Sequence, residues 1–371
     1  MSQYRNINVR SPFYVQHPTT ESLTTLSIRV WNGDVVSDKP TAYNYVLEKE
    51  QTGGQSTFEI AELLRDFCSQ TSDTSSGTVW VETTLDDNVN TPTVVIYLAS
   101  EGYSLYNEGV QHNGNSFETD FVALPKINIT GANEYRQITQ AGDLSVQGGE
   151  VIYIPTYAQP LGSTWKYRYI TNGVAGPYWY VSSSTDSSDA FTYISATSGV
   201  DYVEFDFDGS ISKVYLDTVD TTKYSCGQLS SKLDSSVIVN YVNKFGARSF
   251  MPFDLKHTES VEVSSKSFQR NVMDTASLSN GSGLHASRRM VTGSKQSFTV
   301  NTGWINEYHV KQLEELIMSE YVWAKFSHIS SNFQPVNIKT QNLLKKNHLN
   351  DKLIQYTFKL ETASEYMNTV R

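Results

Sequence analysis

The residues with the clearest capacity for chemistry are four carboxylates in one predicted hairpin at residues 201–217, DYVEFDFDGSISKVYLD. They are Glu204, Asp206, Asp208 and Asp217. Carboxylates two positions apart on one strand face lie about 6–7 Å apart. That spacing suits paired acids of a glycoside hydrolase or oxygen ligands of a Ca²⁺ ion. The third interpretation, which we favour, is a solvated acidic face, because apolar Val203, Phe205 and Phe207 alternate with the carboxylates.

An aromatic tract is the second candidate site. Its members alternate with polar residues in LGSTWKYRYITNG (161–173) or follow in GPYWYVSSSTDSSDAF (176–191), and they are Trp165, Tyr167, Tyr169, Tyr178, Trp179 and Tyr180. Exposed aromatic rings can stack on sugars while their polar tips bond hydroxyl groups. The alternative is that half of the rings build a small core and the others pack at a subunit interface. Neither interpretation predicts an enzyme.

Motifs for other chemistry are missing from the sequence. There is no Lys-Ser/Thr phosphate loop, no Gly-x-Ser-x-Gly turn and no His-Glu-x-x-His pair. The seven histidines are dispersed, and we interpret each as a surface or structural residue. Cys68 and Cys226 belong to no motif and are expected to be reduced and buried. We therefore predict no catalytic residue, no cofactor, no metal site and no small-molecule substrate.

Composition and charge narrow the class of protein. The chain has 371 residues and is rich in Tyr, Val, Thr and Ser, which favours β-structure. Residues 1–235 carry 13 Lys and Arg against 28 Asp and Glu, a net charge of −15, whereas residues 236–371 carry 16 against 11, a net charge of +5. An acidic surface does not bind phosphates, and the basic charges of the last part are scattered, so we predict no sequence-specific nucleic-acid binding.

The N-terminus and the hydropathy bear on the compartment. The stretch MSQYRNINVRSPFYV has no apolar segment of signal-peptide length, so we expect a protein that is made and assembled in a cytoplasm. A membrane span needs about 18 or more apolar residues in a row. We find no such run and predict no membrane span.

These observations predict a mainly-β chain of three units. Residues 1–125 read as a β-sandwich, because Leu26, Ile28 and Val30 alternate with the residues between them, as in a half-buried strand. A short helix is predicted in STFEIAELLRDFC (56–68). Residues 126–235 read as a small aromatic- and Ser-rich β domain. Its different composition is consistent with an insertion between the other two units. The charge step near residue 235 marks the next boundary. Residues 236–371 read as an α+β module.

The third unit contains an amphipathic helix, predicted at 306–319 within NTGWINEYHVKQLEELIMSEYVW (301–323). Asn306 is the predicted N-cap. One side of the helix is apolar, with Tyr308, Leu313, Leu316 and Ile317, and the other side is polar, with Lys311, Gln312, Glu314 and Glu315. Since strands flank it, the apolar side is expected to pack on an antiparallel sheet. Residues 271–294 show no period and are predicted to form a flexible arm.

Several stretches of this chain are similar to those of a known class of proteins. They are NINVRSPFYV (6–15), FEIAELLRDF (58–67), YVNKFGARSFMPFDLKHTESVEV (241–263), the helical stretch 301–323, PVNIKT (335–340) and LIQYTFKLETASEY (353–366). Together they resemble structural proteins of tailed-bacteriophage virions, of the neck, collar, tail-hub and baseplate types. The resemblance covers roughly the first 100 and the last 135 residues. It implies a cofactor-free subunit that is assembled in the host cytoplasm, forms a homo-oligomeric ring and contacts other virion proteins.

Three functional hypotheses follow. The first is a non-enzymatic structural subunit of a virion, in which the arm 271–294 becomes ordered on a neighbouring copy. The alternative is a glycan-binding module for host-surface recognition, acting through the aromatic middle domain. The third is a glycan depolymerase that would use the acidic hairpin around Asp206 and Asp208.

Overall fold

The structure is a computed structural model, and strands dominate it, which confirms the prediction of a mainly-β chain. Two α-helices occur within the described residues. The described residues are 5–18, 21–52, 54–68, 77–103, 143–147, 151–157, 164–182, 188, 191–197, 199–207, 210–219, 237–253, 257–269, 273–274, 279–280, 285, 287–303, 305–306, 310–326, 332–344 and 353–364.

The N-terminal unit is built on a five-stranded sheet with the order β1-β7-β6-β3-β4, in which only β1 and β7 pair in parallel. Its strands are β1 (Arg5–Asn8), β3 (Leu23–Trp31), β4 (Tyr45–Glu50), β6 (Val79–Asp86) and β7 (Thr93–Ser100). A strand pair, β2 (Tyr14–Pro18) and β5 (Gln55–Glu59), and the helix α1 (Ala61–Arg65) share its core. Leu26, Ile28 and Val30 are buried there, as their alternation predicts.

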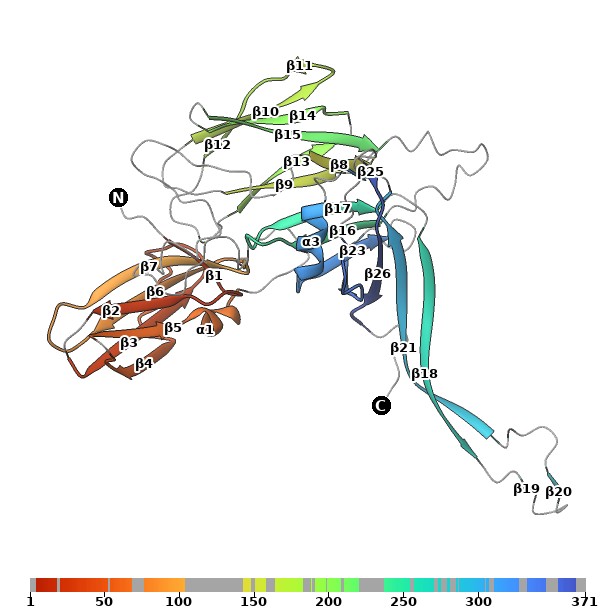
Figure 1. The fold of residues 1–371 in the computed structure, drawn as a ribbon, viewed down its shortest axis with the longest axis horizontal. Coiled ribbons are helices and arrows are strands. Elements are labelled where there is room, and N and C mark those ends of the chain that lie inside the picture. The colour runs from red at the N-terminus through yellow and green to blue at the C-terminus, as the bar shows by residue number, and fades with distance from the viewer. Residues whose placement is uncertain are drawn as a thin grey trace.

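The middle unit is a curved sheet stacked on a strand pair (Figure 1). The sheet has the order β11-β10-β14-β15-β8, and β12 also pairs with β10. Its strands are β8 (Asp143–Gln147), β10 (Thr164–Thr171), β11 (Val174–Ala175), β12 (Trp179–Ser182), β14 (Tyr202–Phe207) and β15 (Ser210–Val219). The pair is β9 (Val151–Tyr157) and β13 (Phe191–Thr197). The predicted hairpin is present as β14 and β15, although its turn residues Asp208 and Gly209 lie outside the described part.

The C-terminal unit is a seven-stranded sheet with the order β17-β16-β23-β24-β26-β21-β18. Its strands are β16 (Val237–Val242), β17 (Arg248–Phe253), β18 (Thr258–Gln269), β21 (Ser287–Asn301), β23 (Val322–Phe326), β24 (Gln334–Ile338) and β26 (Thr357–Thr362). The helix α3 (Val310–Met318) packs against this sheet, and Leu313 and Leu316 are fully buried in the shared core.

The predicted polar side of the helix is wrong, and its predicted N-cap stays a prediction. Asn306 lies in the short strand β22 (Ile305–Asn306), which pairs with β25 (Leu353–Ile354), and residues 307–309 lie outside the described part. The helix described by the structure starts at Val310. On the predicted polar side, Gln312 and Glu315 are each only 2% exposed. Part of the predicted polar side of the helix therefore also faces the protein interior. Glu315 lies close enough to the buried Tyr241 of β16 to raise the pKa of its phenol, although burial of Tyr241 is the larger cause.

The three units meet around the turn between β16 and β17. From the N-terminal unit, the Ser100 hydroxyl donates to the Phe245 carbonyl at 3.3 Å, and the Tyr103 amide donates to the Lys244 carbonyl at 2.7 Å. From the middle unit, the Tyr193 hydroxyl accepts from the Arg248 amide at 3.1 Å. This turn and the first residue of β17 therefore carry contacts to both other units.

The predicted flexible arm at 271–294 is wrong over its second part. Residues 287–294 belong to β21, which pairs with β18 over twelve register positions and forms a long hairpin. Short strands β19 (Met273–Asp274) and β20 (Ser279–Asn280) pair beyond it. The sequence concealed this strand because a register shift at Ser264/Ser265 and the small residues Thr292, Gly293 and Ser294 break the alternation. Figure 1 shows the hairpin extending away from the body of the molecule.

Candidate interaction surfaces

The predicted aromatic site does not form a single platform, because strand alternation divides it. On β10, Trp165 is 1% exposed in the core that the middle and C-terminal units share. Tyr167 and Tyr169 lie on the same side, half-buried against that core, and the Tyr169 hydroxyl donates to the Ser195 carbonyl at 2.7 Å. These three residues stabilise the unit, as the core interpretation of the tract predicts.

The other three aromatic residues of the tract are more accessible. Trp179 is 53% exposed and Tyr180 is 71% exposed on β12, and Tyr178 is half-buried just before it. Tyr180 lies opposite Lys166 in the register, so it belongs to the outer face of the sheet. Trp179 lies opposite Tyr167 and projects from the edge of the inner face.

The carboxylates of β14 lie on this outer face, where cations of the neighbouring strands pair with them. The Arg168 Nε donates to the Glu204 Oε1 at 2.7 Å, and the Lys213 Nζ lies 3.8 Å from the Glu204 Oε2. The Lys166 Nζ lies 3.0 Å from the Asp206 Oδ2, and this hydrogen bond raises the pKa of Lys166. The interpretation of a solvated face is thus wrong for Glu204, which is 4% exposed inside an ion-pair ladder.

The ladder also argues against the two chemical uses of the acidic hairpin. Each of its described carboxylates faces a Lys or Arg rather than another carboxylate, so neither has the environment of a cation ligand. Across the described ranges, no group of three or more His, Cys, Asp or Glu side chains is placed to hold a metal ion. Asp208 lies outside those ranges, and the side chain of Asp217 is not described.

Tyrosine rings cover the cations of the ladder. The Lys166 Nζ and the Arg168 Cζ each lie 4.6 Å from the centre of the Tyr178 ring. On the other side of the ladder, the Lys213 Nζ lies 4.8 Å from the Tyr202 ring, which packs on Tyr215 at 5.1 Å between centroids. Cation–π contacts of this kind hold a ring flat against the sheet.

We call this surface the tyrosine face, defined by Tyr178, Tyr180, Tyr202 and Tyr215. The sequence analysis missed Tyr202 and Tyr215. Both lie on the same side of the hairpin as Glu204, because Tyr202 pairs with Tyr215 and Glu204 pairs with Lys213. The alternation of β14 and β15 contained this signal.

The long hairpin is the second exposed surface. All twelve residues of β18 are exposed, and so are the first four residues of β21. Its exposed apolar side chains are Val261, Val263, Phe268 and Met290, with exposed fractions of 40–53%. A two-stranded ribbon that buries no apolar face is marginally stable in water. The exposed length of the hairpin therefore favours a role as a contact surface.

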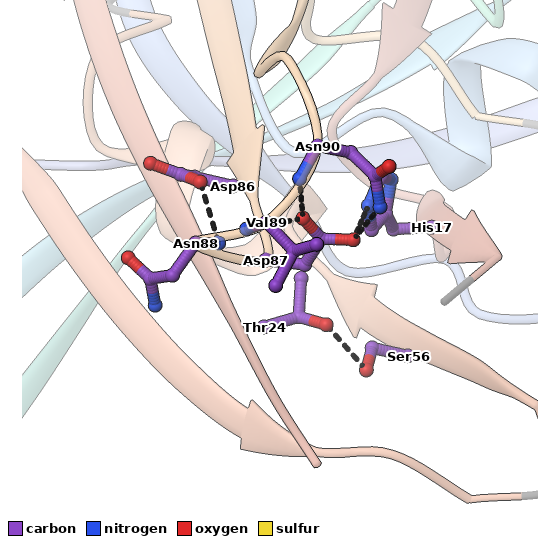
Figure 2. A network of polar contacts seen from close by, with 8 residues as sticks. All are labelled: His17, Thr24, Ser56, Asp86, Asp87, Asn88, Val89 and Asn90. Carbon is purple, nitrogen blue, oxygen red and sulfur yellow. Dashed lines mark hydrogen bonds and ion pairs between the residues drawn. The ribbon is translucent and has the colours of Figure 1, made fainter. Parts of the chain in front are cut away.

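One buried His–Asp pair has the residue types of an acid–base dyad (Figure 2). The His17 Nε2 lies 3.4 Å from the Asp87 Oδ2. Asp87 also accepts from the amides of Val89 and Asn90 and from the Asn90 side chain, at 3.2, 2.8 and 2.7 Å. These bonds use the carboxylate to hold the turn between β6 and β7. His17 thus has the structural role that the sequence analysis assigned to the histidines.

The N-terminal and C-terminal units share a charged junction. The Arg10 guanidinium donates to the Met318 carbonyl at 2.7 Å, and its Nε lies 3.4 Å from Glu320. Arg65 of the segment around α1 also pairs with Glu320. Glu101 is fully buried close to these groups, and burial raises its pKa to about 7. Cys68 is a buried free thiol, as predicted, and burial raises its pKa.

Comparison with known proteins adds no family to this picture. A scan against protein-family models found no match, and a search of curated proteins found none either. In the part of the chain that the structure describes, no helix is long and apolar enough to cross a membrane.

Proposed function

We propose that this protein is a non-enzymatic structural subunit of a tailed-phage virion, in the neck, tail or baseplate region. It acts by assembling into a homo-oligomeric ring and by contacting other virion proteins. The long hairpin is the observation that carries the assembly part, because four of its large apolar side chains are exposed. The resemblance of the N-terminal and C-terminal sequences supports the virion part.

The arrangement of the units supports a mechanical role. In a ring, each subunit binds its two neighbours through two different surfaces. These head-to-tail contacts form a closed ring when the rotation from one subunit to the next completes a circle. The hairpin provides the first surface, and it extends from the edge of the sheet in the C-terminal unit. The acidic first part and the basic last part of the chain suit contacts along an axis with other components.

The solution mass of the purified chain, measured by light scattering with negative-stain images of the same fraction, tests ring assembly. The full chain should form closed rings. A chain in which residues 265–292 are replaced by Asn-Gly should remain monomeric, because a two-residue turn closes the shortened hairpin between Ser264 and Gly293. Tyr180→Ser is the control with an unchanged hairpin. Identical rings from the shortened chain would contradict the role of the hairpin, and a monomer at every concentration of the full chain would contradict self-assembly.

The virion assignment needs a separate measurement. Quantitative mass spectrometry of purified phage particles from cells that express this chain should detect it at a fixed copy number per particle. That number should be a multiple of the ring symmetry seen in the images. A chain found only in the soluble lysate, and never in particles, would refute the assignment.

A second candidate function is glycan binding at the tyrosine face. The specific observation is that Tyr178 and Tyr202 lie over cations, so each ring can present its other side to a sugar. Glycan-array binding that is lost in Tyr178→Ala and Tyr202→Ala, and kept in the exposed control Val174→Ala, would support it. An unchanged array signal in both tyrosine variants would eliminate this face as the binding site.

A further inference from the structure

The outer half of the hairpin has a face of defined chemistry. Beyond the register shift, Lys266 pairs with Met290 and Phe268 pairs with Arg288, so these four side chains share one face. We call them the arm face. All four are exposed, with Phe268 at 44% and Met290 at 53%. The segments 264–269 and 287–293 contain no Asp or Glu, so this face is apolar and positively charged.

A surface with the opposite charge lies on the outer face of the N-terminal sheet. Leu23 of β3, Val46 of β4 and Val94 of β7 are 37%, 57% and 54% exposed there. Carboxylates accompany them, because Glu50 lies opposite Leu23, and Glu48 and Asp86 both lie opposite Thr25. We call the six residues Leu23, Val46, Glu48, Glu50, Asp86 and Val94 the acidic patch.

The two surfaces place their apolar and charged side chains at the same spacing along the strands. In the acidic patch, one row consists of Val46, Ser27, Thr84 and Val94, with one valine at each end and two small residues between them. The carboxylates of Glu48 and Asp86 occupy the next row, about 7 Å away along the strands. On the arm face, each of two adjacent rows at that spacing holds one cation and one apolar side chain, Lys266 with Met290 and Phe268 with Arg288. Lys266 and Arg288, in adjacent rows, can therefore each meet a carboxylate of the acidic patch while Met290 and Phe268 contact its apolar side chains.

The partner that this charge complementarity fits is a second copy of the chain. Figure 1 shows the hairpin extending away from the N-terminal unit, so the arm face and the acidic patch of one copy do not meet. We propose that the arm face of one copy docks on the acidic patch of the next, which makes this contact the one that propagates the ring. The inference rests on the proposed assembly function and identifies the two surfaces that carry it.

Charge exchange tests this pairing in the full-length chain. An arm-reversed variant carries Lys266→Glu and Arg288→Glu, and a patch-reversed variant carries Glu48→Lys and Glu50→Lys. Each variant alone should assemble at least 10-fold more weakly, since like charges then face each other. A 1:1 mixture should assemble again, because each arm then meets a patch of opposite charge. Glu62→Lys on α1, an exposed acidic residue away from the patch, is the control and should leave assembly unchanged.

Cross-linking separates failure of this inference from failure of the proposed function. With p-benzoylphenylalanine in place of Phe268, illumination should join the hairpin to residues 45–50 or 93–95 of a second copy. Cross-links to another surface of a second copy, or normal assembly of both reversed variants alone, would overturn the pairing and leave self-assembly standing. A full chain that remains monomeric and gives no cross-link between copies would overturn both.

Discussion

Glu101 offers a test of the junction between the N-terminal and C-terminal units. Its side chain is fully buried, and within the described part of the chain neither carboxyl oxygen has a hydrogen-bond partner. Burial raises the pKa to about 7 from 4.5, although Arg65 and Arg10 oppose this effect and Glu320 adds to it. The folded protein therefore holds the proton of Glu101 more tightly than the unfolded chain does.

The sign of the pH dependence follows from that difference. Below pH 4.5 both states are protonated, and the neutral carboxyl contributes its full stabilisation. As pH rises toward 7, the Glu101 carboxyl ionises in the unfolded chain but stays protonated in the folded protein, so this stabilisation is lost. One pKa unit corresponds to about 1.36 kcal/mol, so the complete loss amounts to roughly 3 kcal/mol.

The variant Glu101→Gln keeps the neutral form at every pH. Relative to the wild-type protein, its free energy of unfolding should therefore rise by roughly 2–3 kcal/mol between pH 5 and pH 8. Any cost of seating the amide is independent of pH and cancels in this comparison. Urea unfolding at the two pH values measures the difference, and Glu62→Gln, an exposed carboxyl of the same unit, serves as the control. If wild type and Glu101→Gln differ by the same amount at pH 5 and pH 8, the reasoning about Glu101 is wrong.

Three further changes address other parts of the structure. Gly246→Ala should cost roughly 2 kcal/mol, because its φ of +83° is strained for Ala and the Cβ would lie 2.8 Å from the Ser100 Oγ; Gly173→Ala, with a φ of +75° in open space, should cost less in the same thermal unfolding experiment. Asp87→Ala should destabilise the N-terminal unit by roughly 2 kcal/mol in urea unfolding, because it removes the acceptor that holds the turn after β6. Glu204→Ala should destabilise the middle unit by roughly 3 kcal/mol by leaving the ladder cations without their shared carboxylate, which hydrogen exchange of β10 and β14 would detect as faster exchange.

The sequence predicted the parts of the fold that regular alternation encodes. Leu26, Ile28 and Val30 form a buried row on β3, and the stretch from Tyr202 to Asp217 forms a hairpin. It failed where contacts between distant segments decide the environment. Glu204 reads as an exposed acid, yet cations of β10 and β15 bury it. Gln312 reads as a solvent-facing helix residue, and the covered helix buries it as well.

The candidate surfaces show the same division between local and distant information. Tyr180 was identified from sequence because it lies in an aromatic run, whereas Tyr215 was missed because its neighbours along the chain are not aromatic. Only the pairing of β14 with β15 places Tyr215 beside Tyr202. The pairing of β18 with β21 likewise brings together Phe268 and Arg288, which are separated by a long stretch of the chain.

The register shift in the hairpin decides which residues form the arm face. Because Ser264 pairs with Gly293 and Ser265 pairs with Val291, Thr292 is an extra residue in β21, and its hydroxyl donates to the Ser264 carbonyl at 3.1 Å. In a regular ladder Lys266 would lie opposite Val291, and Met290 would point to the other face. The bulge instead places Met290 and Arg288 beside Lys266 and Phe268. The bulge therefore determines which residues of β21 share the face of Lys266 and Phe268, and it leaves Val291 and Arg289 on the opposite face.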